Sequence, residues 1–531
     1  MNANKKKLLP LLIAYGLCAS ILFGCGEETP AEAAVAESEE GNNESSADPY
    51  IRGGSISDYY TKPGEETDAP EDNEKSSSDD TLPQATVTGA FEPNSNAIRV
   101  DSADEDEEQK PVARVDHDLY VATYGNDTND GTYDTPLASV QQAIDMVNPG
   151  HTIYIMSGIY KGANTFNISG TPDKPITITH LPGSNASSVM ISLDYGEEGA
   201  IFDMNGQSNI RLIDLRLGNS IANWVYGVYM PKGTHDIWLE ENEFIDICAP
   251  DIGGAYAILM YGDGDKEADA IHDIYIYDNE IHSIVTGQGM GIAASGNLNT
   301  ITIDGNHIYS VSNHGIDVYG GGRTSFDDYL DQPYDIIVRG NEVHQCTAYN
   351  MLSCSGILID GTRDTTVNDN YVYECPVGIE VCSENYNYDY PTNNILVTGN
   401  TVHNNHDTGI SIGGYNQDYY GTVQNIEVSS NIIYNNGYQA NDGANGEIHF
   451  EKCDGVLVSD NIVRNHDYNY PVIGCGKTSE YVKNVSFVNN LYAYDKPEKM
   501  IFRFQGNIYI GLDNWNKFTG GSDVNATKAG K

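Results

Sequence analysis

Residues 274–281 read IYIYDNEI, and the same pattern of alternating apolar residues followed by an asparagine returns as ITIDGNHI at 301–308 and IIVRGNEV at 336–343. Alternation of this kind is typical of a β-strand with one face toward a core and the other away from it. Aligned asparagines recur at spacings of 27 to 37 residues: Asn242, Asn279, Asn306, Asn341, Asn370, Asn400, Asn431, Asn461 and Asn490. A repeat of this length made of short strands predicts a solenoid in which each period forms one coil.

Asparagine at one bend of every coil has a physical cause. It tolerates left-handed backbone geometry, and its amide can bond to backbone groups at a turn. Stacked coils would place successive amides about 4.8 Å apart, so we expect a hydrogen-bonded asparagine ladder inside the bend. In these motifs the chain resembles the right-handed parallel β-helix of pectate-lyase-like proteins. The resemblance implies an all-β fold, a single-stranded right-handed parallel β-helix.

The opening of the repeat domain predicts a capping element. From about Pro136 to Val147 the apolar residues fall on one helical stripe. A helix laid over the end of a solenoid would shield an open sheet edge. The segment 118–160, DLYVATYGNDTNDGTYDTPLASVQQAIDMVNPGHTIYIMSGIY, resembles the N-terminal part of family 9 polysaccharide lyases and their relatives.

The first 115 residues differ in composition from the repeat. A lysine cluster precedes an apolar stretch, and Leu22-Phe23-Gly24-Cys25 resembles the lipobox of bacterial lipoproteins, which implies a signal peptide over residues 1–25 and lipidation of Cys25. Residues 26–115 are acidic and poor in apolar side chains, which predicts a disordered tether before a β-helix over 116–531. We therefore expect an extracytoplasmic lipoprotein, anchored in a bacterial membrane and exposed at the cell surface.

The charge of the chain excludes one class of partner. The sequence has 28 Lys and Arg against 77 Asp and Glu, a formal net charge of −49. Because nucleic-acid binding needs a basic face that displaces counterions, we expect no nucleic-acid partner. We expect a monomer.

A second motif, Gly-Ile-x-Val/Ile, also recurs once per coil, as HGIDVYG at 314–320, SGILIDG at 355–361 and VGIEVCSE at 377–384. If each isoleucine faces the core, the residues two and four positions after the glycine face outward on one sheet. This places Asp317, Asp360 and Glu380 on one face, with diagonal neighbours roughly 8 Å apart at the backbone, and Glu384 further along the strand of Glu380. Such a cluster could raise a carboxyl pKa, bind a cation or simply lie in water.

The segments around these strands contain residue types that bind sugars. Tyrosine rings stack on pyranose rings, and Asn, Asp and Arg bond to hydroxyl groups, although tyrosines also cover apolar surface at strand ends. We interpret His314, Tyr319, Arg323 and Tyr415 as candidate substrate-binding residues. The expected partner is a polysaccharide or oligosaccharide.

One reaction that fits such a groove is β-elimination on a uronate polysaccharide such as pectate, as in a polysaccharide lyase. The resemblance implies a bound Ca²⁺, a cation that prefers carboxylate oxygens, and Asp317, Asp360 and Glu380 could supply them. Arg363 could act as the base or as a clamp. The sequence departs from the lyase pattern, because Leu358 stands near the position of the family's lysine base.

Two other functions remain open. A glycoside hydrolase needs two carboxyl groups, about 5–5.5 Å apart for retention or roughly 6.5–9.5 Å for inversion, and Asp317, Asp360, Glu380 and Glu384 offer several pairs. A non-catalytic glycan-binding surface protein would need only the tyrosine-walled groove.

Two cysteines follow the repeat. Cys346 and Cys375 lie at the same offset after their ladder asparagines, so they should stack on adjacent coils. Equal ladder positions point the same way, which favours buried thiols over a disulfide.

Overall fold

A computed structural model describes residues 113–184, 186–249, 253–285, 287–348, 353–383, 390–413, 421–438, 446–464 and 469–525. The predicted signal peptide, Cys25 and almost all of the predicted tether lie outside these residues. Within the described ranges, no helix is long and apolar enough to cross a membrane.

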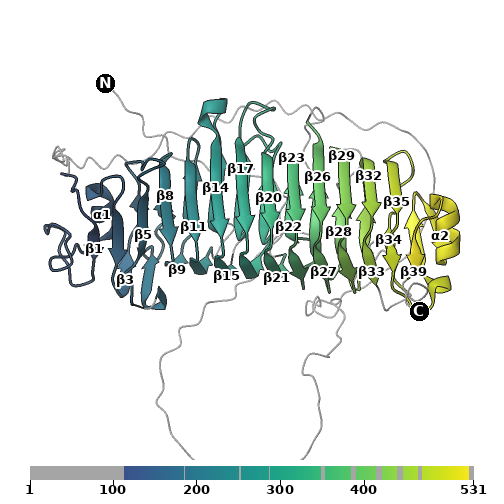
Figure 1. The fold of residues 1–531 in the computed structure, drawn as a ribbon, viewed down its shortest axis with the longest axis horizontal. Helices are drawn as coiled ribbons and strands as arrows, with labels where there is room; N and C mark the ends of the chain where they lie inside the picture. The colour runs from purple at the N-terminus through teal and green to yellow at the C-terminus, as the bar shows by residue number, and fades with distance from the viewer. Residues whose placement is uncertain are drawn as a thin grey trace, which may run out of the picture. The chain divides into compact units, whose positions relative to one another are not determined.

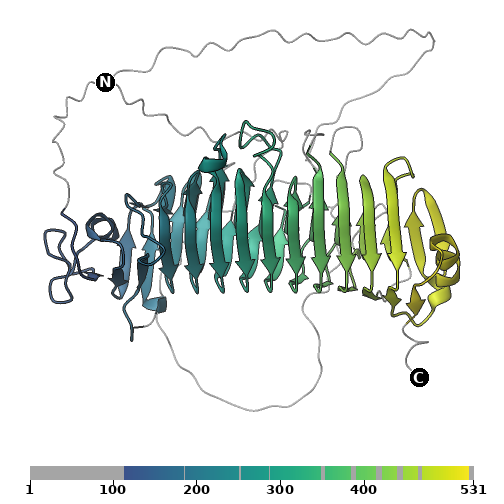
Figure 2. The same cartoon turned by 45° about the horizontal axis from the view of Figure 1, so that its top comes forward.

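The chain winds through three long sheets that run side by side along the solenoid (Figure 1). Every strand pair is parallel except β37 with β38, which form an antiparallel hairpin at the C-terminal end. Each coil adds one strand to each sheet in turn, as the stacked arrows of Figure 2 show.

Sheet 1 contains β1 (Leu119–Val121), β2 (Thr152–Ile155), β5 (Ile176–His180), β8 (Ser208–Ile213), β11 (His235–Glu240), β14 (Ile271–Tyr277), β17 (Leu298–Asp304), β20 (Tyr334–Arg339), β23 (Arg363–Asn368), β26 (Thr392–Thr398), β29 (Val423–Ser429), β32 (Cys453–Ser459) and β35 (Val482–Val488). Sheet 2 contains β3 (Gly158–Lys161), β6 (Val189–Ser192), β9 (Arg216–Ile221), β12 (Glu243–Cys248), β15 (Glu280–Val285), β18 (His307–Ser312), β21 (Glu342–Thr347), β24 (Tyr371–Tyr373), β27 (Thr401–His403), β30 (Ile432–Tyr434), β33 (Ile462–Arg464), β36 (Leu491–Tyr492) and β39 (Val524–Asn525). Sheet 3 contains β4 (Asn164–Thr165), β7 (Gly199–Asp203), β10 (Trp224–Pro231), β13 (Gly254–Gly262), β16 (Ile292–Gly296), β19 (Ile316–Tyr319), β22 (Ser355–Asp360), β25 (Val377–Cys382), β28 (Thr408–Ile412), β31 (Ile448–Phe450), β34 (Ile473–Gly474), β37 (Ile501–Phe504) and β38 (Asn507–Ile510).

Helices stand at the two ends of the described solenoid (Figure 1). α1 (Val140–Met146) begins after Ser139, whose side chain accepts a hydrogen bond from the Gln142 amide. It is shorter than the stretch expected from the apolar stripe, because Leu137 pairs through its backbone with Tyr120 and Ala122. α2 (Leu512–Thr519) lies at the C-terminal end, where Trp515 stacks on Phe502 with ring centroids 4.6 Å apart. Short 3-10 turns lie at Ala186–Ser188, Glu267–Asp269 and Pro497–Lys499.

The asparagine ladder is confirmed. Each of the first eight predicted asparagines donates from its backbone N–H and its side-chain Nδ2 to the Oδ1 atom of the next, at 2.9 to 3.1 Å. The left-handed backbone lies one residue earlier than expected, because the residue before each ladder asparagine has a positive φ: Glu241, Asp278, Gly305, Gly340, Asp369, Gly399, Ser430, Asp460 and Asn489. The asparagine side chain is thereby turned inward, where it is buried.

Carboxylates terminate the ladders. The last asparagine, Asn490, donates from its N–H and Nδ2 to Asp523 Oδ1, at 2.9 and 3.1 Å. A second, short ladder runs from Asn405 to Asn436 and ends on Glu447, whose Oε2 accepts from Asn436 Nδ2 at 2.7 Å. An amide both donates and accepts, so a ladder whose last amide still donates can end on a carboxyl oxygen that accepts.

The cysteine prediction is also confirmed. Cys346 and Cys375 are buried free thiols. Cys375 follows β24, and its backbone N–H donates at 3.1 Å to Oδ1 of Asn405, the first residue of the short ladder. Small apolar side chains there leave room for close packing of the coils.

We predict that Asn341→Ala lowers the free energy of unfolding by about 2 to 5 kcal/mol. The substitution removes the acceptor of both Asn306 donors, and a buried donor without a partner costs about 1–3 kcal/mol. Asn368→Ala, on β23 of the next coil, is the matched control. Asn368 is half-buried, its side chain bonds only to neighbouring Asp369 in the structure, and the substitution should cost less than about 1 kcal/mol. Denaturant unfolding followed by circular dichroism measures both, and equal effects would contradict the ladder's role.

A second prediction concerns pH. Burial raises the pKa of Glu447 to about 8 from its ordinary 4.5. The folded state therefore holds the proton more tightly than the unfolded chain, so this contribution to stability is complete below about pH 4.5 and is lost as pH rises toward 8. Relative to that of Glu447→Gln, the free energy of unfolding of the wild type should fall by up to about 1.4 kcal/mol per pH unit across that window.

The control is Glu427→Gln, at an exposed carboxyl on β29. Its denaturation midpoint should follow that of the wild type at every pH between about 5 and 8. If the denaturation midpoint of Glu447→Gln changes with pH just as that of the wild type does, Glu447 does not ionise in this range.

Candidate functional site

The predicted acidic cluster is on the outer face of sheet 3. Along β19, Ile316 and Val318 belong to the hydrophobic core, and Asp317 alternates with them, so its side chain lies on the opposite face. The same alternation holds in β22 for Asp360 and in β25 for Glu380. One register therefore brings three carboxylates from three consecutive coils to one face.

The pairing defines their spacing. Asp317 lies opposite Leu358, which lies opposite Glu380, so these two acids are two strands apart in one row. Asp360 lies opposite Tyr319 and Cys382, one row further along. Each neighbouring acid pair is diagonal, with backbones roughly 8 Å apart, while Asp317 and Glu380 are about 10 Å apart.

The three carboxylates are buried rather than lying in an open groove as expected. Asp317 is 7%, Asp360 1% and Glu380 3% exposed. One described segment over this face follows β19, where Thr324 Oγ1 lies 2.5 Å from Ser295 Oγ on the neighbouring strand β16. Burial of several like charges is costly unless a cation or hydrogen bonds compensate it, so this is not an ordinary solvated acidic face.

A hydrogen-bonded chain leads into the cluster through His314. The Ser355 hydroxyl donates to Glu380 Oε2 at 2.5 Å, and the Ser355 backbone N–H donates to His314 Nδ1 at 3.0 Å. Burial lowers the pKa of His314 to about 4, so this imidazole is neutral near pH 7 with its proton on Nε2.

A second polar cluster continues the same face toward the C-terminus. Ser411 and His449 follow Glu380 in one row, on the next two strands. His449 Nε2 lies 3.4 Å from Glu451 Oε1, and Lys477 Nζ lies 3.1 Å from Glu451 Oε2. The imidazole and the carboxylate are buried, while Lys477 is partly exposed.

Sequence reasoning did not select His449, Glu451 or Lys477 as site residues. The segment GEIHFEK at 446–452 is a loose copy of the Gly-Ile-x-Val motif, and its alignment places His449 in the row of Glu380. Lys477 follows β34 in a segment that carries no repeat, so its contact with Glu451 is visible only in the folded structure.

Tyrosines line the same face on the N-terminal side. They are Tyr226, Tyr229, Tyr256 and Tyr261, on β10 and β13, and all are half-buried. Tyr226 and Tyr256 lie opposite each other with ring centroids 5.7 Å apart. Burial is the largest cause that raises the pKa of Tyr256, and nearby Asp317 contributes to it. These tyrosines stand on strands rather than in the tyrosine-rich loops that the sequence highlighted.

The remaining predicted residues are more scattered. Tyr319 is half-buried in the row of Asp360, and Arg323 is exposed in the segment after β19. Arg363 begins β23 of sheet 1, where its guanidinium lies 3.9 Å from the ring centroid of Tyr334 and 2.9 Å from Asp364. It therefore belongs to a different sheet from the acids. Glu384 and Tyr415 lie outside the described residues.

Comparison with known proteins identifies the fold. Residues 200–390 match the family model described as a right handed beta helix region. A 315-residue stretch is 28% identical to the uncharacterized protein YwoF of Bacillus subtilis strain 168, and covers 57% of this chain and 66% of that protein. A 126-residue stretch is 33% identical to pectate lyase PEL9 of Emericella nidulans, and covers 21% of this chain but only 29% of that enzyme.

Solved structures of similar fold include the GH136 lacto-N-biosidase from Eubacterium ramulus, with a TM-score of 0.49 at 12% identity over 71% of this chain and 67% of that one. Pectate lyase Pel9A aligns with a TM-score of 0.34 at 15% identity, over 72% and 77% of the two chains. Together with the three parallel sheets, the family match identifies residues 113–525, as far as they are described, as the expected right-handed parallel β-helix.

Proposed function

We propose that the outer face of sheet 3 is the active site of an enzyme that cleaves a polysaccharide. The observation that carries the proposal is a single row in which the buried polar side chains of Asp317, Glu380 and His449 alternate with Leu358 and Ser411 over five adjacent strands. A linear polymer matches a site that is extended along the solenoid, and the tyrosines of β10 and β13 offer stacking surface for sugar rings.

The reaction that we favour is β-elimination on a uronate polymer such as pectate. The local identity to a fungal pectate lyase supports this choice, although it covers less than a third of that enzyme. The reaction requires a base for the proton next to the uronate carboxylate and positive charge for the carboxylate itself. A face that carries this many acids needs a cation before it can accept such a substrate.

We propose that Asp317, Asp360 and Glu380 would hold a calcium ion once their side chains close on it, since in the described residues their oxygens are not already gathered within 4.8 Å of one another. Calcium takes six to eight oxygen ligands, and three carboxylates on one face can offer up to six. The Ser355 hydroxyl bonds one oxygen of Glu380 and holds that side chain in place. Bound Ca²⁺ would supply the charge that neutralises a uronate carboxylate.

His449 is our candidate for the base. A neutral imidazole can accept a proton, and histidine is the most common general base in enzymes. Glu451 Oε1 lies 3.4 Å from its Nε2, and Lys477 Nζ lies 3.1 Å from Glu451 Oε2. We assign Lys477 the role of balancing the charge of Glu451 or of a bound uronate. Arg363, which the sequence offered as a base or a clamp, lies on sheet 1 and has no part in this proposal.

Glycoside hydrolysis is the second candidate. The diagonal pairs Asp317–Asp360 and Asp360–Glu380 have backbones roughly 8 Å apart, from which side chains reach the range of about 6.5–9.5 Å that inversion requires. Hydrolysis would need no calcium and no imidazole.

We predict that the full chain forms unsaturated uronate products from polygalacturonate, and that EDTA abolishes this activity. The new double bond absorbs in the ultraviolet, while a reducing-end assay measures cleavage of either kind. A panel with alginate and neutral glycans defines the polymer. Reducing ends without unsaturation, insensitive to EDTA, would instead assign hydrolysis, and binding without cleavage would assign a glycan-binding protein.

We further predict that His449→Gln lowers kcat by about 10²- to 10⁴-fold, the usual contribution of a general base. Asp317→Asn should also lower activity, with partial recovery as calcium is raised, because it removes one ligand but not the base. Glu427→Gln on β29 of sheet 1 is the control and should keep full activity. Full activity of His449→Gln would remove this residue from the mechanism.

We also propose that the protein is an extracytoplasmic lipoprotein held at the cell surface through Cys25. The lipobox-like sequence supports this proposal. After expression in a bacterium, Cys25→Ser should move the protein from the membrane fraction to the soluble fraction, and an unchanged distribution would contradict lipidation.

A further inference from the structure

The outer face of sheet 2 carries two neighbouring rows of polar side chains. One row consists of aromatic rings that stack with centroids 4.6 to 5.3 Å apart: His282, Tyr309, His344, Tyr373, His403 and Tyr434. The other row begins two residues earlier on each strand, with Glu243, Glu280, His307 and Glu342 in register. This surface is on a different sheet from the acidic cluster.

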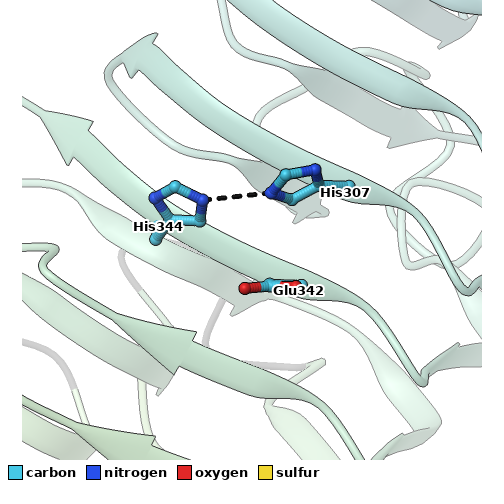
Figure 3. A group of neighbouring side chains, drawn as sticks. All are labelled: His307, Glu342 and His344. Atoms are coloured by element: carbon cyan, nitrogen blue, oxygen red, sulfur yellow. Dashed lines mark hydrogen bonds between the residues drawn. The ribbon is translucent and has the colours of Figure 1, made fainter.

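A simple rule connects the rows. Each ring reaches diagonally to the acid on the preceding strand: His282 Nε2 lies 3.3 Å from Glu243 Oε1, and the Tyr309 hydroxyl donates to Glu280 Oε1 at 2.9 Å. The next ring, His344, meets His307 where the rule would place an acid. The two Nε2 atoms face each other at 3.1 Å (Figure 3).

Glu342 completes a three-residue group. It lies opposite His307 in the register and two residues before His344 on β21. One ligand atom from each of the three side chains lies within 4.8 Å of the others, and Figure 3 shows the carboxylate beside the imidazole pair. The Tyr373 hydroxyl donates to Glu342 Oε1 at 2.9 Å and so positions the carboxylate.

This geometry suits a transition metal. Two Zn–N bonds of about 2.0–2.1 Å at a tetrahedral angle place the nitrogens about 3.3 Å apart, close to the observed 3.1 Å. The carboxylate oxygen, which lies within 4.8 Å of a nitrogen of each imidazole, must come closer to close the set. Two imidazoles and one carboxylate favour Zn²⁺ and its neighbours over Ca²⁺ or Mg²⁺, which prefer oxygen ligands only.

We propose that His307, Glu342 and His344 form a binding site for a zinc-class divalent cation on the outer face of sheet 2. Three protein ligands leave at least one coordination position open to water or another ligand. Tyr373 acts as a positioning residue through its bond to Glu342, as partners of metal ligands commonly do. All three ligands are half-buried, so a cation can reach them from solvent.

The test uses the full chain, freed of metal with a chelator and then titrated with Zn²⁺ alone by calorimetry. This acidic chain offers many sites made only of carboxylates. Excess Mg²⁺ and Ca²⁺ in the buffer occupy these sites, so that Zn²⁺ is left to bind where nitrogen ligands are present. We expect one site that persists under these conditions. Co²⁺ should occupy the same site and give the visible absorption of nitrogen-coordinated cobalt.

Variants assign the site. His344→Gln should weaken Zn²⁺ binding by more than about tenfold and abolish the cobalt spectrum, and Tyr373→Phe should weaken binding by about tenfold. His403→Gln is the matched control, because His403 stacks in the same row but faces Tyr371 rather than a second ligand. It should bind as the wild type does.

Thermal unfolding of each variant checks that the coils remain intact. If His344→Gln does not fold, Glu342→Gln, at a half-buried carboxylate, serves instead and should weaken binding by more than about tenfold. Zinc binding that is absent under excess Mg²⁺ and Ca²⁺, or unchanged in the ligand variants, would show that His307 and His344 form only a hydrogen-bonded pair and would overturn the proposal.

Discussion

The rest of the structure depends on the register of the coils, and the asparagine ladder is the interaction that holds it. Each ladder amide accepts from the coil before it and donates to the coil after it, so a coil displaced by one residue would leave several buried donors without acceptors. Such a slip would also turn every side chain of the displaced strand to the opposite face of its sheet. Asp317, for example, would then point into the core in place of Ile316. The position of every functional group on the surface therefore follows from a buried row of amides.

The ladder also explains two buried acids that have no evident part in chemistry. Asp523 accepts from Asn490, Trp515 and Tyr492, and burial raises its pKa. Glu447 plays the corresponding part for the short ladder. In both cases a carboxyl oxygen accepts the last hydrogen bonds of a row of groups that donate forward. A search for catalytic carboxyls by raised pKa alone would select Glu447, although geometry assigns it to the fold.

The sequence predicts those features of the structure that recur in every coil. Ladder positions, the alternation of strands and the common face of Asp317, Asp360 and Glu380 all follow from motifs whose period can be read directly. It fails where the segments between strands differ in length and sequence. Arg363 stands three residues after Asp360, but the chain turns a corner between them and Arg363 joins another sheet. Lys477 meets Glu451 from a segment without a motif. The pairing of His307 with His344 needs the exact offset between adjacent strands, which a spacing of 37 residues does not reveal by itself.

The same register of the coils gives the outer faces of sheet 3 and sheet 2 different chemistry. On sheet 3 the outward positions hold carboxylates near one another with a hydroxyl and an imidazole beyond them, an oxygen-rich surface suited to hard cations and charged sugars. On sheet 2 the outward rings stack because each ring occupies the same position in its coil. In the neighbouring row His307 stands where other coils have glutamate, so its Nε2 faces the Nε2 of His344 in the stack. A cation that prefers nitrogen ligands would thus bind at sheet 2, and one that prefers oxygen ligands at sheet 3, because the two faces offer different donor atoms. Since both rows rest on the same buried ladder, neither site needs a dedicated loop to position it.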